Sequence, residues 1–250
     1  MRKPLAAAGV LFLAALGGAF FSDLLFPLDP GTLSSRPVSR AEAASCLKLL
    51  AGRNEGRGGR EGDPWNLAFW GTAEDVRHAL ALAGWTEVPL SLGKSLRAGT
   101  AELLSGSQLR RFPPFNLYRF LSRNQDMNWA VIDRPLVSRH HFRLWRTGFT
   151  DPEGRELWWG SGNRDLAIRW RDLSHRPDPD MDSERAFIAS TLGRKVPGVK
   201  LSLVRLPQIP LSGENDKGYA FRTDGRVLLV ELPVQGRAGP SDAPPTARDR

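Results

Sequence analysis

Residues 139–146 have the sequence Arg-His-His-Phe-Arg-Leu-Trp-Arg, and this stretch decides the predicted fold. Side chains along a β-strand point alternately to opposite faces. One face of such a strand carries His140, Phe142 and Leu144, and the other carries Arg139, His141, Arg143 and Trp145. Cationic groups inside a protein need acidic partners, because an unpaired buried charge is very costly. The stretch therefore predicts a central strand with one polar face.

Acidic side chains that can pair with this face follow further along the chain. Asp165 comes first, and several more carboxylates lie close behind His175. We expect these groups to meet in three dimensions as one polar centre, although the sequence assigns none of them a catalytic role. The candidate residues of this centre are Arg139, His141, Arg143, Asp165, His175, Asp180, Asp182, Glu184 and Arg185.

Composition narrows the class of protein. The chain has 250 residues, enough for one large domain or two small ones, and its 41% hydrophobic content is ordinary for a globular protein. The formal net charge is +8, but the basic residues are spread along the chain and no nucleic-acid motif is present. We therefore expect an arginine-rich surface and no nucleic-acid partner. The single cysteine, Cys46, excludes an intrachain disulfide and a thiolate-rich zinc module.

The N-terminus resembles a membrane segment. Arg2 and Lys3 precede an apolar run over residues 4–21, which continues over residues 24–28. Its length is close to the ~20 residues that a transmembrane helix needs. A single uncleaved anchor is favoured over a cleaved signal peptide, because a good cleavage site is missing. The flanking charges predict an inner-membrane anchor with the rest of the chain on the periplasmic or extracytoplasmic side.

The remaining chain divides by composition. Residues 1–28 are the anchor or signal peptide, and residues 29–62, which include Gly56-Arg57-Gly58-Gly59-Arg60, have the composition of a flexible tether. Residues 63–233 hold the folded domain. Residues 234–250 are rich in Gly, Pro, Ser, Asp and Arg, which predicts a disordered tail.

Within the folded domain, short helices alternate with strands. Thr72 and Asp75 have the spacing of a capping box, which predicts a helix over 73–83 that ends at Gly84. A weaker helix is expected over 95–104. Asp178 and Pro179 predict the start of an acidic helix that ends at Gly193. Residues 157–161 should pair with the central strand. The prediction is one α+β domain, with a mixed or mostly antiparallel sheet covered by two or three helices.

These stretches together resemble the LssY C-terminal domain family of bacterial envelope proteins. The likeness covers about residues 62–232 and depends on the order and spacing of several motifs. They are Gly62-Asp63-Pro64-Trp65-Asn66, Ala83-Gly84-Trp85, Arg123-Asn124-Gln125-Asp126, residues 139–145, Trp159-Gly160, Asp165, residues 175–185 and Thr223-Asp224-Gly225-Arg226. In the family, the domain follows one N-terminal membrane segment, or phosphatase-like or transporter-like membrane regions. The resemblance implies identity and location more than a mechanism.

The chain departs from the family pattern at the polar centre. His175 is followed by Arg176, where the family usually has two adjacent histidines. The stretch Gly162-Asn163-Arg164-Asp165 replaces the usual small-Thr-Phe-Asp. These differences bear on any activity that needs the second histidine.

Three interpretations of the polar centre follow. In the first, His141, His175 and Asp165 bind a divalent metal ion that activates water, together with one of Asp180, Asp182 or Glu184, of which Asp182 is preferred. In the second, arginines and carboxylates form a salt-bridge network with neutral histidines. In the third, the arginine row binds an anionic ligand, because guanidinium forks suit phosphate and carboxylate, while Trp145, Trp158 and Trp159 offer stacking faces.

The sequence thus favours a membrane-anchored accessory or anionic-ligand-binding module of the cell envelope, with an anionic lipid or glycan as partner. The alternative is a metal-dependent hydrolase acting on an envelope phosphoester or a similar substrate. No cofactor other than the divalent metal of that alternative is expected. A nucleophilic serine or cysteine enzyme is not expected, because no Gly-x-Ser-x-Gly motif occurs and Cys46 lies in the predicted tether.

Overall fold

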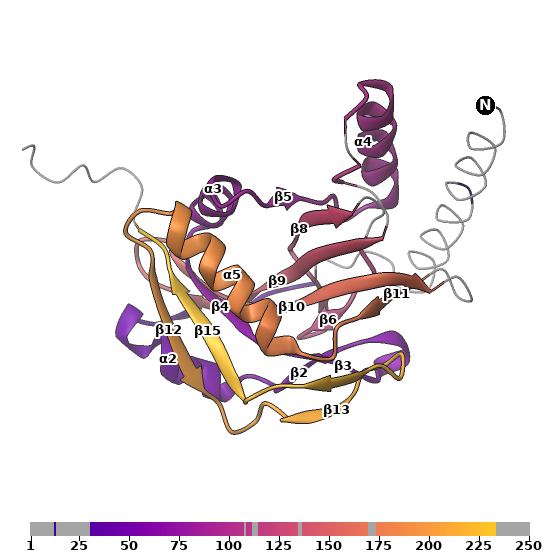
Figure 1. Ribbon diagram of the computed structural model, residues 1–250. Coiled ribbons are helices and arrows are strands. Elements are labelled where there is room, and N and C mark those ends of the chain that lie inside the picture. The colour runs from indigo at the N-terminus through magenta and orange to yellow at the C-terminus, as the bar shows by residue number, and fades with distance from the viewer. Residues whose placement is uncertain are drawn as a thin grey trace, which may run out of the picture.

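The computed structural model describes residue 13 and residues 31–107, 109–111, 115–134, 137–169 and 174–233 (Figure 1). The expected membrane anchor at residues 1–28, apart from Leu13, and the expected tail at residues 234–250 lie outside the described residues. None of the helices in the described ranges has both the length and the apolar composition to span a membrane.

A nine-stranded mixed sheet forms the centre of the described molecule. Its main path runs β12-β15-β4-β10-β9-β8-β5, with β11 added to β10 and β1 added to β9. The pairs β15–β4 and β1–β9 are parallel and the others are antiparallel. The strands are β1 (Arg36–Pro37), β4 (Leu67–Gly71), β5 (Thr86–Glu87), β8 (Met127–Arg134), β9 (Ser138–Thr150), β10 (Glu156–Arg169), β11 (Ser174–Pro177), β12 (Lys200–Arg205) and β15 (Arg226–Glu231).

Two smaller sheets and four α-helices complete the described part of the chain. The smaller sheets have the orders β3-β2-β6-β7 and β13-β14. Their strands are β2 (Arg53–Glu55), β3 (Glu61–Pro64), β6 (Arg119–Phe120), β7 (Arg123–Asn124), β13 (Ser212–Glu214) and β14 (Ala220–Arg222). The helices are α2 (Ala43–Cys46), α3 (Ala73–Leu82), α4 (Leu92–Leu104) and α5 (Met181–Lys195), with 3-10 turns η1 (Arg40–Glu42), η2 (Leu47–Leu49) and η3 (Arg57–Gly59). This confirms the α+β class and the mixed sheet.

Helices α3 and α5 cover one face of the large sheet (Figure 1). Val76 and Leu80 from α3 and Ile188 from α5 pack with Phe142 and Leu144 of β9, all fully buried. Burial of each such side chain contributes roughly 1.5–3 kcal/mol. The alternation of residues 139–146 thus sets the register correctly, with Phe142 and Leu144 on the helix-covered face. Helix α4 projects beside the edge of the sheet instead of covering it (Figure 1).

The opposite face packs against the N-terminal segment, which corrects the expectation of a flexible tether over residues 29–62. Ala43, Cys46 and Leu47 are buried against Trp145 and Trp159 in a second core. Strands β2 and β3 join β6 and β7 in the four-stranded sheet. The glycines around Arg57 suggested a linker, but Gly58 and Gly59 have φ angles of 65° and 74°, so they shape a tight turn. Residues 31–62 therefore belong to the domain.

Capping residues explain where α3 and α5 begin and where α3 ends. Thr72 accepts a hydrogen bond from the Asp75 amide, and the Asp75 carboxylate accepts one from the Thr72 amide, so the predicted capping box is confirmed. Gly84 follows α3 with a φ of 89°, the left-handed conformation expected there. For α5, the N-cap is Asp180 instead of the predicted Asp178, because the Asp180 Oδ1 accepts from the amides of Asp182 and Ser183.

Candidate functional site

Strand β9 sends its polar side chains to both faces of the sheet. The ring of His141 packs edge-on against Phe115, with centroids 5.0 Å apart, on the face away from α5. The ring of His140 stacks on Phe187 of α5, with centroids 3.6 Å apart. The single polar centre expected from the sequence is therefore divided by the sheet itself.

Asp165 collects three cationic or titratable groups on the face away from α5. The β9–β10 register places Asp165 directly opposite Arg139. The Oδ2 atom of Asp165 lies 3.0 Å from Arg139 Nε, 3.6 Å from His141 Nδ1 and 4.0 Å from His175 Nδ1. We call Arg139, His141, Asp165 and His175 the Asp165 cluster. Its members were all predicted, and its most exposed side chain is His175, at 17%.

Burial and charge set the protonation of this cluster. Burial raises the pKa of the Asp165 carboxyl, but the two imidazoles and the guanidinium around it outweigh that effect and bring the pKa down to about 2. Burial lowers the pKa of His141 well below its usual 6.5, despite the attraction of Asp165. Asp165 is therefore ionised and held by Arg139, while His141 is a neutral imidazole at neutral pH.

Arg143 lies on the same face but has a different set of neighbours. Its guanidinium is 5.2 Å from the ring centroid of Phe115 and 4.8 Å from that of Tyr118. Its Nε donates to the carbonyl of Asn116 at 3.2 Å. The Tyr118 hydroxyl donates to Asp216 Oδ1 at 2.9 Å, which fixes the ring over Arg143. Within the described ranges, no carboxylate oxygen lies within 4.0 Å of the Arg143 guanidinium.

Several buried polar atoms beside Arg143 lack a protein partner. The strand registers place Asn128 opposite Arg143 and Asn163 opposite His141, in adjacent rows of the sheet. Asn128 Nδ2, His141 Nδ1 and Asn163 Oδ1 are buried without a hydrogen bond in the described structure. Each such atom costs about 1–3 kcal/mol if it stays unsatisfied. His141 Nδ1 faces Asp165 Oδ2, so it is the two asparagine atoms and Arg143 that mark a place where a polar ligand would complete the structure.

A second polar pair lies on the α5 face. His140 Nδ1 and Glu184 Oε2 are 2.5 Å apart, and the Glu184 side chain is fully buried. The Nε2 atom of His140 is 3.4 Å from Asp133 Oδ1, and Asp133 pairs with Arg164. Burial raises the pKa of Glu184, and the hydrogen bond from His140 opposes that rise. Glu184 thus pairs with His140 and not with the arginine row.

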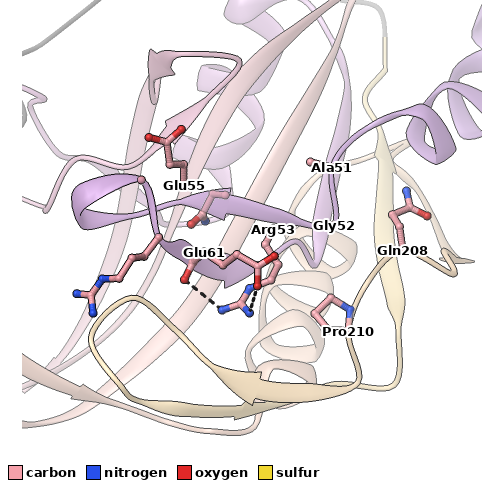
Figure 2. Close-up of a pocket in the computed structure, with 10 residues that line it drawn as sticks. Ala51, Gly52, Arg53, Glu55, Glu61, Gln208 and Pro210 are labelled. Carbon is pink, nitrogen blue, oxygen red and sulfur yellow. Dashed lines mark hydrogen bonds and ion pairs between the residues drawn. The ribbon is translucent and has the colours of Figure 1, made fainter.

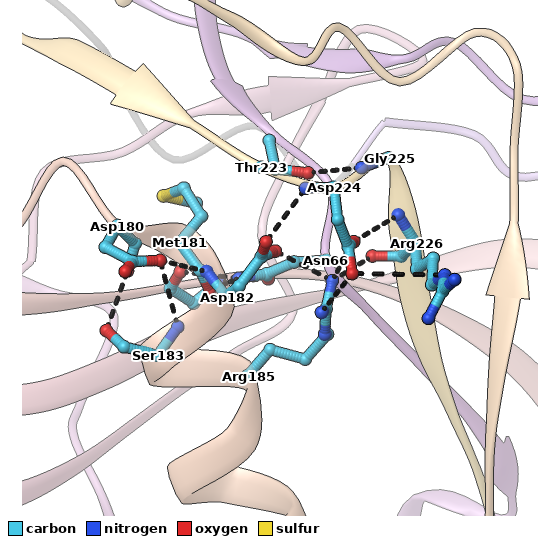
Figure 3. A network of polar contacts seen from close by, with 11 residues as sticks. Asn66, Asp180, Met181, Asp182, Ser183, Arg185, Thr223, Asp224, Gly225 and Arg226 are labelled. Carbon is cyan, nitrogen blue, oxygen red and sulfur yellow. Dashed lines mark hydrogen bonds and ion pairs between the residues drawn. The ribbon is translucent and has the colours of Figure 1, made fainter.

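A third group lies at the start of α5 (Figure 3). Arg185 Nη1 is 2.9 Å from Asp182 Oδ1, and Arg185 Nη1 and Nη2 donate to the two Asp224 oxygens at 2.8 and 3.0 Å. Asp182 Oδ2 accepts from the Asp224 amide at 2.8 Å. Asp180 caps the helix and lies 3.3 Å from Arg222. This network joins α5 to the turn before β15.

The nine predicted residues therefore fall into separate groups, and the predicted metal set does not assemble. His141 and His175 both approach Asp165, whereas Asp182 belongs to α5, which packs on the other face of the sheet. Both Asp182 oxygens are engaged by Arg185 and the Asp224 amide. Among the residues that the structure describes, no three His, Cys, Asp or Glu side chains are placed to hold one metal ion.

The salt-bridge network predicted for the centre forms in part. Arg139 holds Asp165 and Arg185 holds Asp182, although the sequence named these residues only as members of one network and did not assign the pairs. The expected stacking tryptophans, however, are core residues. Trp145 and Trp159 pack with Trp65 on one face, and Trp158 packs in the other core, all with no exposed surface. The aromatic neighbours of Arg143 are Phe115 and Tyr118 instead.

Sequence reasoning missed several of the polar residues at these sites. Glu184 was predicted, but its partner His140 was not. Each of them interrupts an apolar row, one on a helix and one on a strand, and this shared feature would have paired them. Asn128 and Asn163 carried no such signal, because their role depends on strand register. Phe115 and Tyr118 lie in the segment without regular secondary structure just before β6. Their packing on Arg143 is a contact between distant segments, which the sequence does not indicate.

A surface groove of about 410 Å³ lies between β2 and the loop after β12 (Figure 2). It is lined by Ala51, Gly52, Arg53, Asn54, Glu55, Gly59, Arg60, Glu61, Gln208 and Pro210. Its central guanidinium, Arg53, is already bonded to Glu61 and to the carbonyls of Gly62 and Glu214. The groove therefore offers a ligand less unsatisfied polarity than the face around Arg143.

Comparison with protein families gives the chain its identity. The model of the family described as LssY C-terminus matches residues 47–227. The chain belongs to this family. No curated protein and no solved structure matches the chain.

The match places both β9 faces inside the LssY C-terminal domain. It begins at Leu47, within the segment expected to be a tether, and it includes the turn at Asp224. The Asp165 cluster, Arg143 and the His140–Glu184 pair are thus all parts of this domain. The family likeness expected from the motifs is confirmed.

Proposed function

We propose that this LssY C-terminal domain binds an anionic group, a phosphate or a carboxylate, at the face of β9 that carries Arg143 and the Asp165 cluster. The observation that supports it most directly is the environment of Arg143. Its guanidinium is buried between Phe115 and Tyr118 and has no carboxylate within 4.0 Å among the described residues. A buried cation without a counter-charge is costly, so an anion that reaches it gains binding energy.

The neighbours of Arg143 support the same role. Asp165 is already held by Arg139, so the cluster has no second carboxylate for Arg143. The unpaired donor of Asn128 and the ring of His141 lie in adjacent rows, where they can contact a bound oxyanion. A guanidinium offers two parallel donors in a fork, which suits phosphate and carboxylate alike.

Calorimetric titration with inorganic phosphate, and separately with acetate, at constant ionic strength tests this role. We expect saturable binding of at least one of them, and an affinity at least about tenfold weaker in Arg143→Met, because a charged hydrogen-bonding partner is removed. Arg143→Lys keeps the charge but loses the fork, so it should bind with intermediate affinity.

The matched control is Arg77→Met, which removes an arginine of α3 whose side chain is 51% exposed. Its affinity should equal that of the parent protein. Absence of saturable binding of either anion to a folded parent protein, or equal weakening in both methionine variants, would refute the proposal.

We further propose that the domain acts as an accessory module of the cell envelope, held at the inner membrane by residues 1–28 and facing outwards. The apolar run behind Arg2 and Lys3 supports this. In intact spheroplasts, protease should remove a peptide tag fused at the C-terminus of the domain, which stays in the membrane fraction. Deletion of residues 1–28 should release it from that fraction, and protection from protease would contradict the proposed side.

A further inference from the structure

The two histidines of the Asp165 cluster are arranged alike. Each directs its Nδ1 atom at the same oxygen, Asp165 Oδ2, at 3.6 Å for His141 and 4.0 Å for His175. A carboxylate at Nδ1 favours the tautomer with the proton on that nitrogen, which leaves the Nε2 lone pair for chemistry. Such an oriented imidazole is a nucleophile or an acid-base group.

His141 has the surroundings of a nucleophile that acts on phosphorus. Its ring is neutral at neutral pH, because burial favours the uncharged form. Asp165 can stabilise the positive charge that the ring gains when Nε2 forms a bond. Arg143, one row away on the same face, supplies the anion-binding fork. His175 has the most exposed side chain of the cluster and lies next to Asp165, where it can supply a proton.

We propose that the domain hydrolyses a phosphoester through a covalent bond to His141, an activity that rests on the anion binding proposed above and needs no metal ion. The phosphoryl group is held by Arg143, His141 is the nucleophile, and His175 is the acid. Asp165 is a positioning residue that orients both rings. This differs from the metal-dependent hydrolysis expected from the sequence, because Asp182, the carboxylate of the acidic helix preferred as a ligand there, lies in another network.

The reaction proceeds in two balanced steps. In the first, His141 Nε2 attacks phosphorus, a P–N bond forms as the ester P–O bond breaks, and the departing oxygen takes a proton from the imidazolium of His175. In the second, water attacks phosphorus and the P–N bond breaks. The proton of that water returns to His175, and His141 is again neutral. Each step transfers one phosphoryl group and one proton, and neither changes an oxidation state.

The activity test uses the full chain with p-nitrophenyl phosphate and bis(p-nitrophenyl) phosphate, which distinguish a monoester from a diester. Turnover of one of them should persist in excess EDTA. We expect His141→Asn to reduce kcat by more than about a hundredfold, as loss of a nucleophile does. His78→Asn, which changes an exposed histidine of α3, is the control and should leave kcat unchanged.

Two further measurements separate roles from general damage. Mass spectrometry after alkaline quenching should detect a phosphoryl adduct on His141 that is lost in acid. His175→Asn should slow phenyl phosphate much more than p-nitrophenyl phosphate, because p-nitrophenolate leaves without needing a proton. A purely structural role of His175 would slow both substrates equally, which would overturn its assignment as the acid.

The outcomes distinguish this inference from the proposed binding function. If inorganic phosphate binds and Arg143→Met abolishes that binding, but neither ester is turned over, the hydrolysis falls and the binding function stands. Turnover that EDTA abolishes, or that survives in His141→Asn, also overturns the covalent route. If neither binding nor turnover occurs in folded protein, both proposals fall.

Discussion

His140 and His141 are neighbours in sequence with opposite environments. His140 faces α5 and shares a hydrogen bond with buried Glu184, whereas His141 faces Phe115 and Asp165. The period of two along a strand produces this separation without any change of backbone. Each residue therefore has its own measurable consequence.

Buried, neutral His141 should make stability depend on pH. Its folded pKa lies below the usual 6.5, so below about pH 6.5 the unfolded chain binds a proton that the folded chain does not. Its contribution is complete above that pH and is lost as the pH falls, by at most about 1.4 kcal/mol per pH unit. Urea unfolding should show His141→Gln losing less stability than the parent protein between about pH 7 and about pH 5.

Asp165 acts in a separate window, because its folded pKa is about 2 and its usual value is 3.8. A depressed carboxyl pKa gives stability that is present above 3.8 and lost as the pH falls towards about 2. The titration of Asp165 therefore does not affect the comparison of the parent protein with His141→Gln between about pH 7 and about pH 5. A parent protein and a His141→Gln variant with parallel pH profiles would show that His141 is not buried in its neutral form.

The His140–Glu184 pair should show strong coupling. His140→Leu leaves the buried Glu184 carboxyl without its partner and should lower the unfolding free energy by about 3–5 kcal/mol. The double variant His140→Leu/Glu184→Leu should be more stable than the single one, because no buried polar group is left unpaired. Chemical denaturation of the parent protein, His140→Leu, Glu184→Leu and the double variant measures the coupling, and additive losses would contradict it.

At the scale of elements, α5 is held at its N-terminus by one arginine. Arg185 is 6% exposed and donates to both oxygens of Asp224 and to the Arg226 carbonyl. The contact ties the start of α5 to the turn before β15 (Figure 3). The packing of α5 on β9 and β10 thus depends on a loop almost 40 residues away, since Asp224 is 39 residues from Arg185.

Arg185→Met should lower the unfolding free energy by about 2 kcal/mol, because hydrogen bonds to a charged partner are lost and Asp224 stays partly exposed to water. Arg222→Met is the matched control. Its side chain is 66% exposed and lies 3.3 Å from Asp180, so its loss should be under about 1 kcal/mol. Equal losses of unfolding free energy in the two variants would show that Arg185 does not hold α5 to the turn before β15. Thermal and urea unfolding provide the measurement.

At the scale of the molecule, segments from near both ends of the described range complete the large sheet and its cores. β15, near the C-terminal end, pairs in parallel with β4, while the segment around Leu47 covers the tryptophan-rich face. The pairings of β4 with β10 and with β15 join segments far apart in sequence, so the domain has no separable half.

Removal of residues 31–62 should therefore unfold the domain. Fully buried Leu47 would be lost, and β6 would lose its partner strand β2. A chain of residues 31–233 should show a cooperative thermal transition and resist limited proteolysis, and one of residues 63–233 should do neither. Within the longer chain, Leu47→Ala should cost about 2–5 kcal/mol. A folded 63–233 fragment would restore the tether interpretation.

The sequence alone was sufficient for the features that depend on local periodicity. The alternation of residues 139–146 placed Phe142 and Leu144 in the core, and the spacing of Thr72 and Asp75 located the start of α3. The order of motifs was sufficient for the family, and the mixed α+β class followed from alternating helices and strands. Arg139 and Asp165 were recognised by their charge as members of one polar centre, and the structure pairs them.

Only the tertiary structure decided which charges meet. Helix α5 packs on the face of the sheet that bears His140, so Glu184 reaches that histidine. On the opposite face, Asp165 of β10 reaches His141 of the neighbouring strand β9. The composition of residues 29–62 suggested a tether, yet a few apolar side chains there, Leu47 among them, are enough to bury the segment. The physical reason is common to both cases: strand and helix periods determine which side of an element a residue occupies, but the partner of that side depends on contacts between distant parts of the chain.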